Sequence, residues 1–251
     1  MSNFDVSRDI TPVDAVAKIE KLGIVRIQDY APDVSEIKDE LMSIYDHMEP
    51  NYQFGKAIRT DDPNWDLAQT PKTAAFFNSP WMREIASKYQ LTQQACQGAL
   101  YPESYGFQRE LFSTYDFLHD QGTATQGWVH FDKLQRFKFF LNVTDIDEDC
   151  GPFQAAIGTH ITTKALRAKD PNPASPAKWR FGKYCGDEGV PGPKDDVRTS
   201  GLQNHYPEIE YELTPMTGAA GTLLVFDSDV FHKGGNVAEG KNRIVVRGHS
   251  W

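Results

Sequence analysis

The segment WVHFD, at residues 128–132, is the part of the sequence from which both the fold and a candidate site can be inferred. It has the composition of a short strand, and in a strand residues i and i+2 point to the same face. His130 and Asp132 therefore bring an imidazole and a carboxylate to one face. Because a His-x-Asp triplet also arises by chance, other parts of the sequence have to support it.

His232 offers a third ligand of a suitable kind, in the strand-like segment 230–233. Two histidines and one carboxylate form the facial triad of non-haem iron(II) sites, which leaves coordination positions open for a chelating co-substrate and for dioxygen. The alternative is that His130 and His232 are hydrogen-bonded core histidines and that Asp132 is a turn carboxylate. We expect His160 and His249 not to be ligands.

Arg243 favours the metal-site interpretation, because it begins the last strand-like segment eleven residues after His232. A guanidinium group presents a planar fork of donors that matches a carboxylate bidentately. The far carboxylate of 2-oxoglutarate needs an anchor of this kind. We therefore predict iron(II), 2-oxoglutarate and dioxygen as cofactor and co-substrates.

Short strand-like runs extend outward from these residues, and 19 glycines and 15 prolines separate many of them. The expected strands cover residues 24–27, 107–115, 128–132, 137–146, 152–157, 209–213, 222–226, 230–233 and 243–248. Helices are expected at 11–22, from 35 onward, and at 79–98. The sequence thus predicts a mainly β protein with flanking helices.

One domain of 251 residues is expected, with an α-rich part at 1–105 and a β core at 106–251. An insertion at about 161–207 interrupts the core. It contains a cluster of basic residues: Lys164, Arg167, Lys169, Lys178, Arg180 and Lys183. This cluster is either a solvated surface or a lid that closes over an anionic substrate.

The composition excludes several classes of partner. A formal net charge of −9 makes nucleic acid an improbable partner, and no run of 18 apolar residues predicts a membrane span. Residues 1–10 lack the basic start and apolar run of a secretory leader, so we expect neither secretion nor membrane insertion. The three cysteines have no disulfide-type or metal-type spacing. We expect a cytoplasmic protein that acts on a small molecule.

Five groups of residues together resemble the phytanoyl-CoA dioxygenase family. They are Gly23-Ile24-Val25-Arg26-Ile27, His130-x-Asp132, Asp149-Cys150-Gly151-Pro152-Phe153, Gly158-Thr159-His160, and His232 with Arg243. The resemblance implies a double-stranded β-helix, or jelly roll, as the core. It also implies an iron(II)- and 2-oxoglutarate-dependent dioxygenase that releases succinate and carbon dioxide and hydroxylates an unactivated carbon.

Two departures from the family pattern concern the co-substrate site and one turn. Many relatives have a serine two residues after the distal histidine, where this sequence has Gly234, and the turn at 156–160 lacks proline. Because Asp132 is retained, hydroxylation is favoured over halogenation. The same iron site is also compatible with desaturation, cyclisation or epimerisation, and a jelly roll is compatible with a non-catalytic module that binds a sugar or small ligand.

The alternation of side chains along a strand suggests further site residues. If Arg243 points inward, Arg247 shares its face, because both lie at alternate positions of one strand. The family pattern points Lys138 and Asn142 into the same cavity. A buried cation favours an anionic partner, so we expect Lys138 and Arg247 to bind a carboxylate of the co-substrate or an acidic group of the substrate, with Asn142 beside them.

Two more co-substrate contacts are expected from the resemblance alone. Gln108 and Thr114 lie on one face of the predicted strand 107–115, and the family draws polar contacts to 2-oxoglutarate from the equivalent strand. The expected substrate is a small polar or anionic metabolite.

Overall fold

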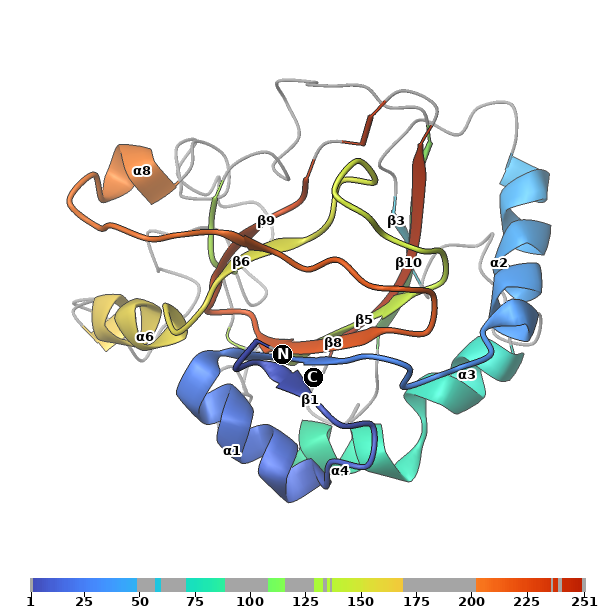
Figure 1. Ribbon diagram of the computed structural model, residues 1–251, viewed down its shortest axis with the longest axis horizontal. Coiled ribbons are helices and arrows are strands. Elements are labelled where there is room, and N and C mark those ends of the chain that lie inside the picture. Colours follow the sequence, from blue (N-terminus) through green and yellow to red (C-terminus); the bar gives the residue numbers. More distant parts are fainter. Residues whose placement is uncertain are drawn as a thin grey trace, which may run out of the picture.

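Two β-sheets and a set of helices make up the computed structural model (Figure 1). It describes residues 2–48, 57–59, 71–88, 108–115, 129–132, 135, 137–168, 202–235, 237–238 and 241–249. In these ranges the protein is mainly β with flanking helices, as the sequence predicts. No helix in the described part of the chain is long and apolar enough to cross a membrane.

Within the described residues, the larger sheet has seven strands, and only its β1–β2 pair is parallel. In spatial order they are β1 (Asp5–Val6), β2 (Ile24–Ile27), β8 (Leu223–Asp227), β5 (Phe137–Asn142), β10 (Asn242–His249), β4 (Gln108–Tyr115) and β3 (Ala57–Arg59). The smaller sheet has the order β7 (Thr214–Pro215), β6 (Gln154–Ala156), β9 (Phe231–Lys233). Residues 129–132 lie beside β9, joined to it by an antiparallel bridge between His130 and His232.

The chain passes repeatedly between the two sheets. It runs from β4 in the larger sheet to 129–132 beside the smaller one, back to β5, and on to β6 and β7. It then returns to β8, crosses to β9 and ends in β10. This alternation brings residues 129–132 next to β9, although about a hundred residues separate them in sequence.

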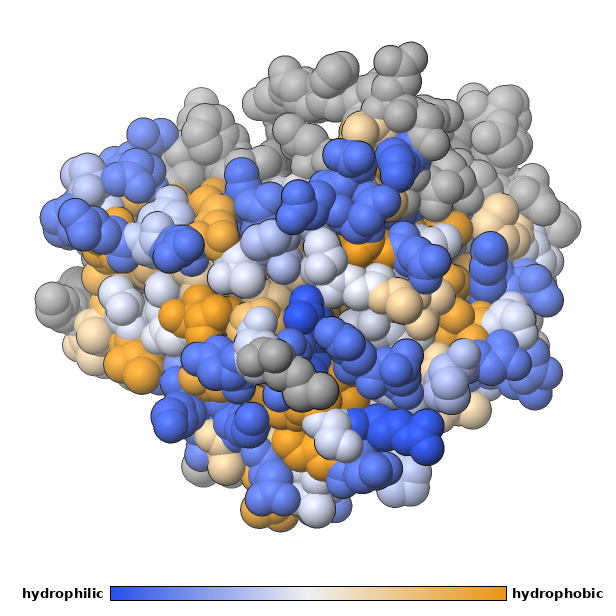
Figure 2. Space-filling model, in the orientation of Figure 1, coloured by the Kyte–Doolittle hydropathy of each residue, from blue (hydrophilic) through white to orange (hydrophobic). Residues whose placement is uncertain are grey.

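Helices cover the outer face of the larger sheet. They are α1 (Pro12–Leu22), α2 (Ser35–Met48), α3 (Pro71–Phe77) and α4 (Pro80–Lys88), and Figure 1 shows α1 and α4 below β8. Alternate strand residues such as Phe139, Val225 and Val246 pack with Ile19 and Met82 of these helices in one buried cluster. On the face shown in Figure 2, hydrophilic residues are interspersed with apolar ones over α1 and α4.

The first helix illustrates how local sequence sets an element's ends. Thr11 caps α1, since its hydroxyl oxygen accepts a hydrogen bond from the Asp14 amide at 3.1 Å, and Pro12 occupies the first turn. Gly23 ends the helix in the left-handed region, with a φ of 81°. A side chain at Gly23 would also collide with Val230 and His160, so the chain can turn directly into β2 only with glycine there.

The inner face of the larger sheet carries the other set of alternate residues. Lys138 is opposite Phe226 on β8 and His249 on β10, while Arg247 is opposite Phe140. Lys138 and Asn142 are buried on this face, and Phe226 packs in a second apolar cluster with residues of the smaller sheet. The predicted alternation of side chains between the inner and outer faces of β5 and β10 is therefore confirmed.

Several predicted elements differ from the structure. Residues 209–213 form no strand, because Tyr211 and Leu213 pack against Phe231 without joining the sheet ladder, and only Thr214–Pro215 pairs with β6. The predicted strands 137–146 and 152–157 shorten to β5 and β6, and residues 129–132 make an isolated bridge. Of the predicted helix 79–98, α4 accounts for 80–88, residue 79 precedes the helix, and residues 89–98 lie outside the described residues.

Three helices were not expected. One is α3, which precedes α4. The other two, α6 (His160–Ala168) and α8 (Leu202–His205), lie in the predicted insertion. Leu166 of α6 and Leu202 of α8 both pack in the apolar cluster beside residues 129–132, so these two ends of the insertion belong to the folded core.

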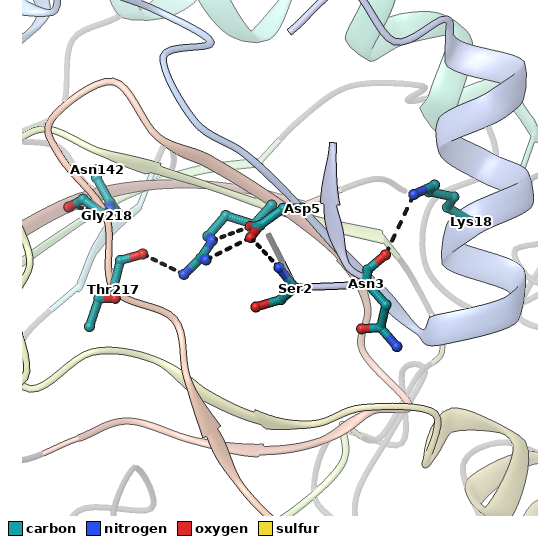
Figure 3. Close-up of polar contacts among 8 residues, drawn as sticks. Ser2, Asn3, Asp5, Lys18, Asn142, Thr217 and Gly218 are labelled. Carbon is teal, nitrogen blue, oxygen red and sulfur yellow. Dashed lines mark hydrogen bonds and ion pairs between the residues drawn. The ribbon is translucent and has the colours of Figure 1, made fainter. Parts of the chain in front are cut away.

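A buried ion pair ties the N-terminal segment to the sheet. Arg26 donates hydrogen bonds from Nε to Asp5 Oδ1 at 2.7 Å and from Nη1 to the Thr217 carbonyl at 2.8 Å. Its guanidinium also lies 5.0 Å from the centre of the Phe4 ring. Figure 3 shows Asp5 and Thr217 at opposite ends of these hydrogen bonds, with the Ser2 amide directed at Asp5.

Replacing Arg26 with methionine is expected to lower the free energy of unfolding by about 3 kcal/mol, because the Asp5 carboxylate would remain buried without its cation. The double variant Asp5→Leu/Arg26→Met should lose less than the single variant, since it leaves no buried charge. Urea denaturation of the three proteins measures both differences. A double variant less stable than Arg26→Met would contradict this account of the pair.

The same pair should respond to acid. Burial raises the pKa of Asp5, but its hydrogen bonds to Arg26 and Ser2 and the Arg26 charge more than offset this, so the pKa lies below its ordinary value of 3.8. A carboxyl with a lowered pKa stabilises the fold above its unfolded value and loses that contribution as pH falls through the folded value. The wild type should therefore lose more stability below pH 3.8 than the double variant does.

Candidate metal centre

His130, Asp132 and His232 converge between the two sheets. The backbones of His130 and His232 exchange hydrogen bonds of 2.9 and 2.7 Å, so the two rings stand directly opposite on one face, with their centroids 4.5 Å apart. Asp132, two residues along, points to the same face. One ligand atom from each residue lies within 4.8 Å of the others, and all three side chains are buried.

The ring of His232 is held in the orientation that a metal ligand needs. Its Nδ1 donates a hydrogen bond to the Val230 carbonyl at 2.6 Å, which leaves the lone pair on Nε2. Nε2 lies 3.9 Å from Asp132 Oδ1. Burial, followed by the nearby His130, lowers the pKa of His232 well below 6.5. The imidazole is therefore neutral at physiological pH, which is the form that binds metals.

A tight turn at 227–230 positions both Asp132 and His232. The Ser228 carbonyl accepts a hydrogen bond from the Asp132 amide at 2.9 Å, and the Val230 carbonyl holds the His232 ring. The turn itself is built on Asp227, whose Oδ1 accepts from the Asp229 amide at 2.9 Å and whose Oδ2 accepts from Gln135 Nε2 at 2.6 Å. The turn thus positions two ligands at once.

Helix α6 supports the turn from the other side. Thr163 Oγ1 donates to the Asp229 carbonyl at 2.6 Å, and Lys164 Nζ lies 3.6 Å from Asp227 Oδ2. Sequence reasoning missed these supporting residues and placed Lys164 in a basic cluster that was either a solvated surface or a lid. The available signal was the pair of acidic residues Asp227 and Asp229 immediately after an apolar strand, where acids are rarely buried without a partner.

Lys138 contacts the candidate site directly. Its Nζ lies 2.5 Å from Asp132 Oδ2, and the side chains of both residues are about one tenth exposed or less. The prediction placed Lys138 in the cavity to bind an anion of the co-substrate or substrate. The structure places it on the inner face of β5, buried, with the Asp132 carboxylate as a partner.

Arg243 and Arg247 form a cationic region further along the inner face. Arg243 is buried, and Arg247 lies 5.7 Å from the centre of the Phe140 ring. Burial, followed by the nearby Arg247 charge, lowers the pKa of Arg243 to about 10. A buried guanidinium group with a second, partly buried one near it favours the binding of a carboxylate.

The remaining predicted residues lie around this region. Asn142 donates from Nδ2 to the Gly218 carbonyl at 3.4 Å, a contact that links β5 to the loop before β8 (Figure 3). Thr114 pairs with Arg243 and Gln108 with His249 in the β4–β10 register, while the side chains of Thr114 and Gln108 lie outside the described residues.

Two further histidines, His160 and His249, are not expected to bind the metal. His160 is buried away from the triad, and its Nε2 donates to the Glu20 carbonyl at the end of α1, 2.9 Å away. It therefore joins two helices, in agreement with the expectation that it is not a ligand. The side chain of His249 lies outside the described residues.

The residues present fit a divalent metal. Two imidazole nitrogens and one carboxylate oxygen meet in a buried position, one ring has its tautomer fixed, and the backbone of the carboxylate residue is hydrogen-bonded. Together, the two-sheet fold and this group define the chain as a β protein with a candidate facial-triad metal site.

Comparison with solved structures shows that proteins with iron and 2-oxoglutarate chemistry share this fold. EctD from S. alaskensis, in a structure with 2-oxoglutarate and 5-hydroxyectoine, is 13% identical, with a TM-score of 0.58 over 96% of this chain and 77% of that chain. The non-heme alpha ketoglutarate dependent carbocyclase SnoK from nogalamycin biosynthesis is 11% identical, with a TM-score of 0.54 over 96% of this chain and 85% of that chain. At these identities the likeness establishes a common fold.

Sequence comparisons add no closer relationship. No protein-family model matches the sequence, and no curated protein matches it either. The resemblance to the phytanoyl-CoA dioxygenase family therefore stays a prediction.

Proposed function

We propose that the protein is an iron(II)- and 2-oxoglutarate-dependent dioxygenase with a double-stranded β-helix core, similar to the phytanoyl-CoA dioxygenase family. The observation that carries the proposal is the convergence of His130, Asp132 and His232 within 4.8 Å, with the His232 ring oriented by Val230. The alternation of the chain between two sheets and the fold shared with EctD and SnoK support it. A cytoplasmic location remains a prediction.

His130, Asp132 and His232 would hold the iron. When bound, iron(II) lets dioxygen oxidise 2-oxoglutarate to succinate and carbon dioxide, with the second oxygen atom inserted into a carbon–hydrogen bond of the substrate. The protein itself would position the metal and the substrate and would exclude water from the site. The three ligands are buried, and the ring centroids of Phe153 and Phe226 lie 5.3 and 5.6 Å from that of His232. These apolar surroundings would exclude water from the bound metal.

Arg243 would bind the distal carboxylate of 2-oxoglutarate. It lies on the inner face of β10, and the inward residues of that strand run in register with Lys138, Phe140 and Asn142 of β5. A co-substrate along this face would reach from the triad toward Arg243. Thr114, opposite Arg243 on β4, and Gln108 are the candidates for the hydrogen bond that the family's serine gives and Gly234 lacks.

The substrate is a small polar or anionic metabolite in this proposal, with Lys138, Asn142 and Arg247 as its contacts. Hydroxylation is the favoured outcome because Asp132 leaves no room for a halide ligand. EctD was solved with 5-hydroxyectoine and SnoK is named a carbocyclase, so the shared fold accommodates hydroxylation as well as ring formation. Desaturation, cyclisation and epimerisation are the alternative outcomes of the same site, and a non-catalytic sugar- or ligand-binding module is the alternative without chemistry.

Turnover of the co-substrate tests the proposal. The wild type, given iron(II), ascorbate and 2-oxoglutarate in air, is expected to release succinate slowly, and anionic metabolites that are substrates should accelerate the release. His232→Ala is the matched control and should release none, because it lacks one of the three ligand atoms. A wild type that releases no more succinate than His232→Ala under all conditions would favour the binding module.

A further inference from the structure

The two oxygens of the Asp132 carboxylate have different surroundings. Oδ1 faces the metal-binding side, 3.9 Å from His232 Nε2, whereas Oδ2 lies 2.5 Å from Lys138 Nζ. The Asp132 backbone is held by its hydrogen bond to the Ser228 carbonyl. We propose that Lys138 is a positioning residue that keeps Oδ2 away from the metal, so that Asp132 binds through Oδ1 alone. This inference rests on the metal site proposed above.

Lys138 is well placed to act as a fixed partner. Its neighbours Phe137 and Phe139 are fully buried in the apolar cluster between the larger sheet and the helices. Because side chains alternate along a strand, the Lys138 side chain lies on the inner face of β5. Its ammonium lies 6.0 Å from the centre of the Phe226 ring, an attractive distance for a cation. A buried ammonium needs an anion within reach, and Asp132 Oδ2 supplies one.

The consequence concerns the number of open metal positions. Carboxylates bind hard cations through one oxygen or through both. An octahedral ion held by two imidazoles and one carboxylate oxygen keeps three positions open, enough for a chelating 2-oxo acid and for dioxygen. A second oxygen of Asp132 would take one of these three. Lys138 thus keeps the site open by occupying Oδ2.

This role differs from the binding of an anionic ligand by Lys138. A lysine that only binds the co-substrate or substrate would leave the coordination of Asp132 unchanged in their absence. A lysine that holds Oδ2 changes that coordination before any organic ligand is added. The distinguishing measurement therefore uses the protein loaded with metal alone.

The test is the structure of Mn(II)-loaded protein without 2-oxoglutarate, determined for the wild type, Lys138→Met and Lys138→Gln. Glutamine keeps a hydrogen-bond donor without the charge, which protects the fold if methionine leaves Asp132 too poorly paired. We expect one Asp132 oxygen on the metal in the wild type and both in Lys138→Met, together with loss of most of the 2-oxoglutarate binding in that variant.

Two results would overturn the inference in different ways. Single-oxygen coordination in both variants at full metal occupancy would refute the role of Lys138 and leave the proposed function intact. A wild type that binds neither Mn(II) nor iron(II) would refute the metal site itself, and the inference with it. Lys138→Arg is the conservative control and should keep single-oxygen coordination, because arginine can still donate to Oδ2.

Discussion

Replacing His232 with alanine is expected to weaken iron(II) binding by more than about a hundredfold, since losing even a supporting partner of a metal ligand costs ~10–100-fold. His232 contributes one of three ligand atoms, and its ring is oriented by the Val230 carbonyl. Alanine would leave His130 and Asp132, which cannot enclose the ion on one face. Equilibrium dialysis of the anaerobic apoprotein against iron(II) measures the change.

His160→Ala is the matched control for this prediction. His160 is as buried as His232, but it donates to the Glu20 carbonyl and lies outside the triad. Its loss should lower the free energy of unfolding by about 1–3 kcal/mol while iron binding is retained. The metal site would be in error if His232→Ala bound iron as the wild type does, or if both variants lost it equally.

Replacing Arg243 with alanine is expected to raise the 2-oxoglutarate concentration needed for half-saturation by roughly a hundredfold, as removal of a buried charged hydrogen-bonding partner costs about 2–5 kcal/mol. Arg243 is buried on the inner face of β10 beside Arg247. Iron(II) binding without 2-oxoglutarate should be unchanged. Calorimetric titration of the metal-loaded protein with 2-oxoglutarate measures the effect.

Two further arginine variants make the Arg243 result specific. Arg243→Lys should retain only part of the affinity, because lysine keeps the charge but lacks the planar fork. Arg83→Ala removes an exposed arginine from α4 and should bind 2-oxoglutarate as the wild type does. Equal affinity in Arg243→Ala and Arg83→Ala would exclude Arg243 as the anchor.

The metal triad could be inferred from sequence because its physical basis is local. Strand periodicity alone puts His130 and Asp132 on one face, and the donor chemistry calls for a second histidine. The same periodicity oriented Lys138, Asn142 and Arg247 inward, since β5 and β10 are regular strands without an interruption in their pairing. Side-chain directions cannot be inferred from alternation where no strand pairing forms, as at residues 209–213.

The supporting contacts could not be inferred in this way. The turn at Asp227, its bond to Gln135 and the pairing of Lys138 with Asp132 join residues from different strands and loops, whose distances depend on the tertiary fold. Helix α6 was missed because it was read as part of an insertion, although its Thr163 and Lys164 hold the turn next to His232. Periodicity gives the direction of a side chain but not its partner.

The central claim is that one buried site binds iron(II) and 2-oxoglutarate together, and anaerobic titration of the wild-type apoprotein with both tests it most directly. A 2-oxo acid chelated to iron(II) gives a weak visible charge-transfer band. We expect this band to appear with one equivalent of each ligand and to be absent from His232→Ala. A wild type that shows no band at saturating iron(II) and 2-oxoglutarate would contradict the account.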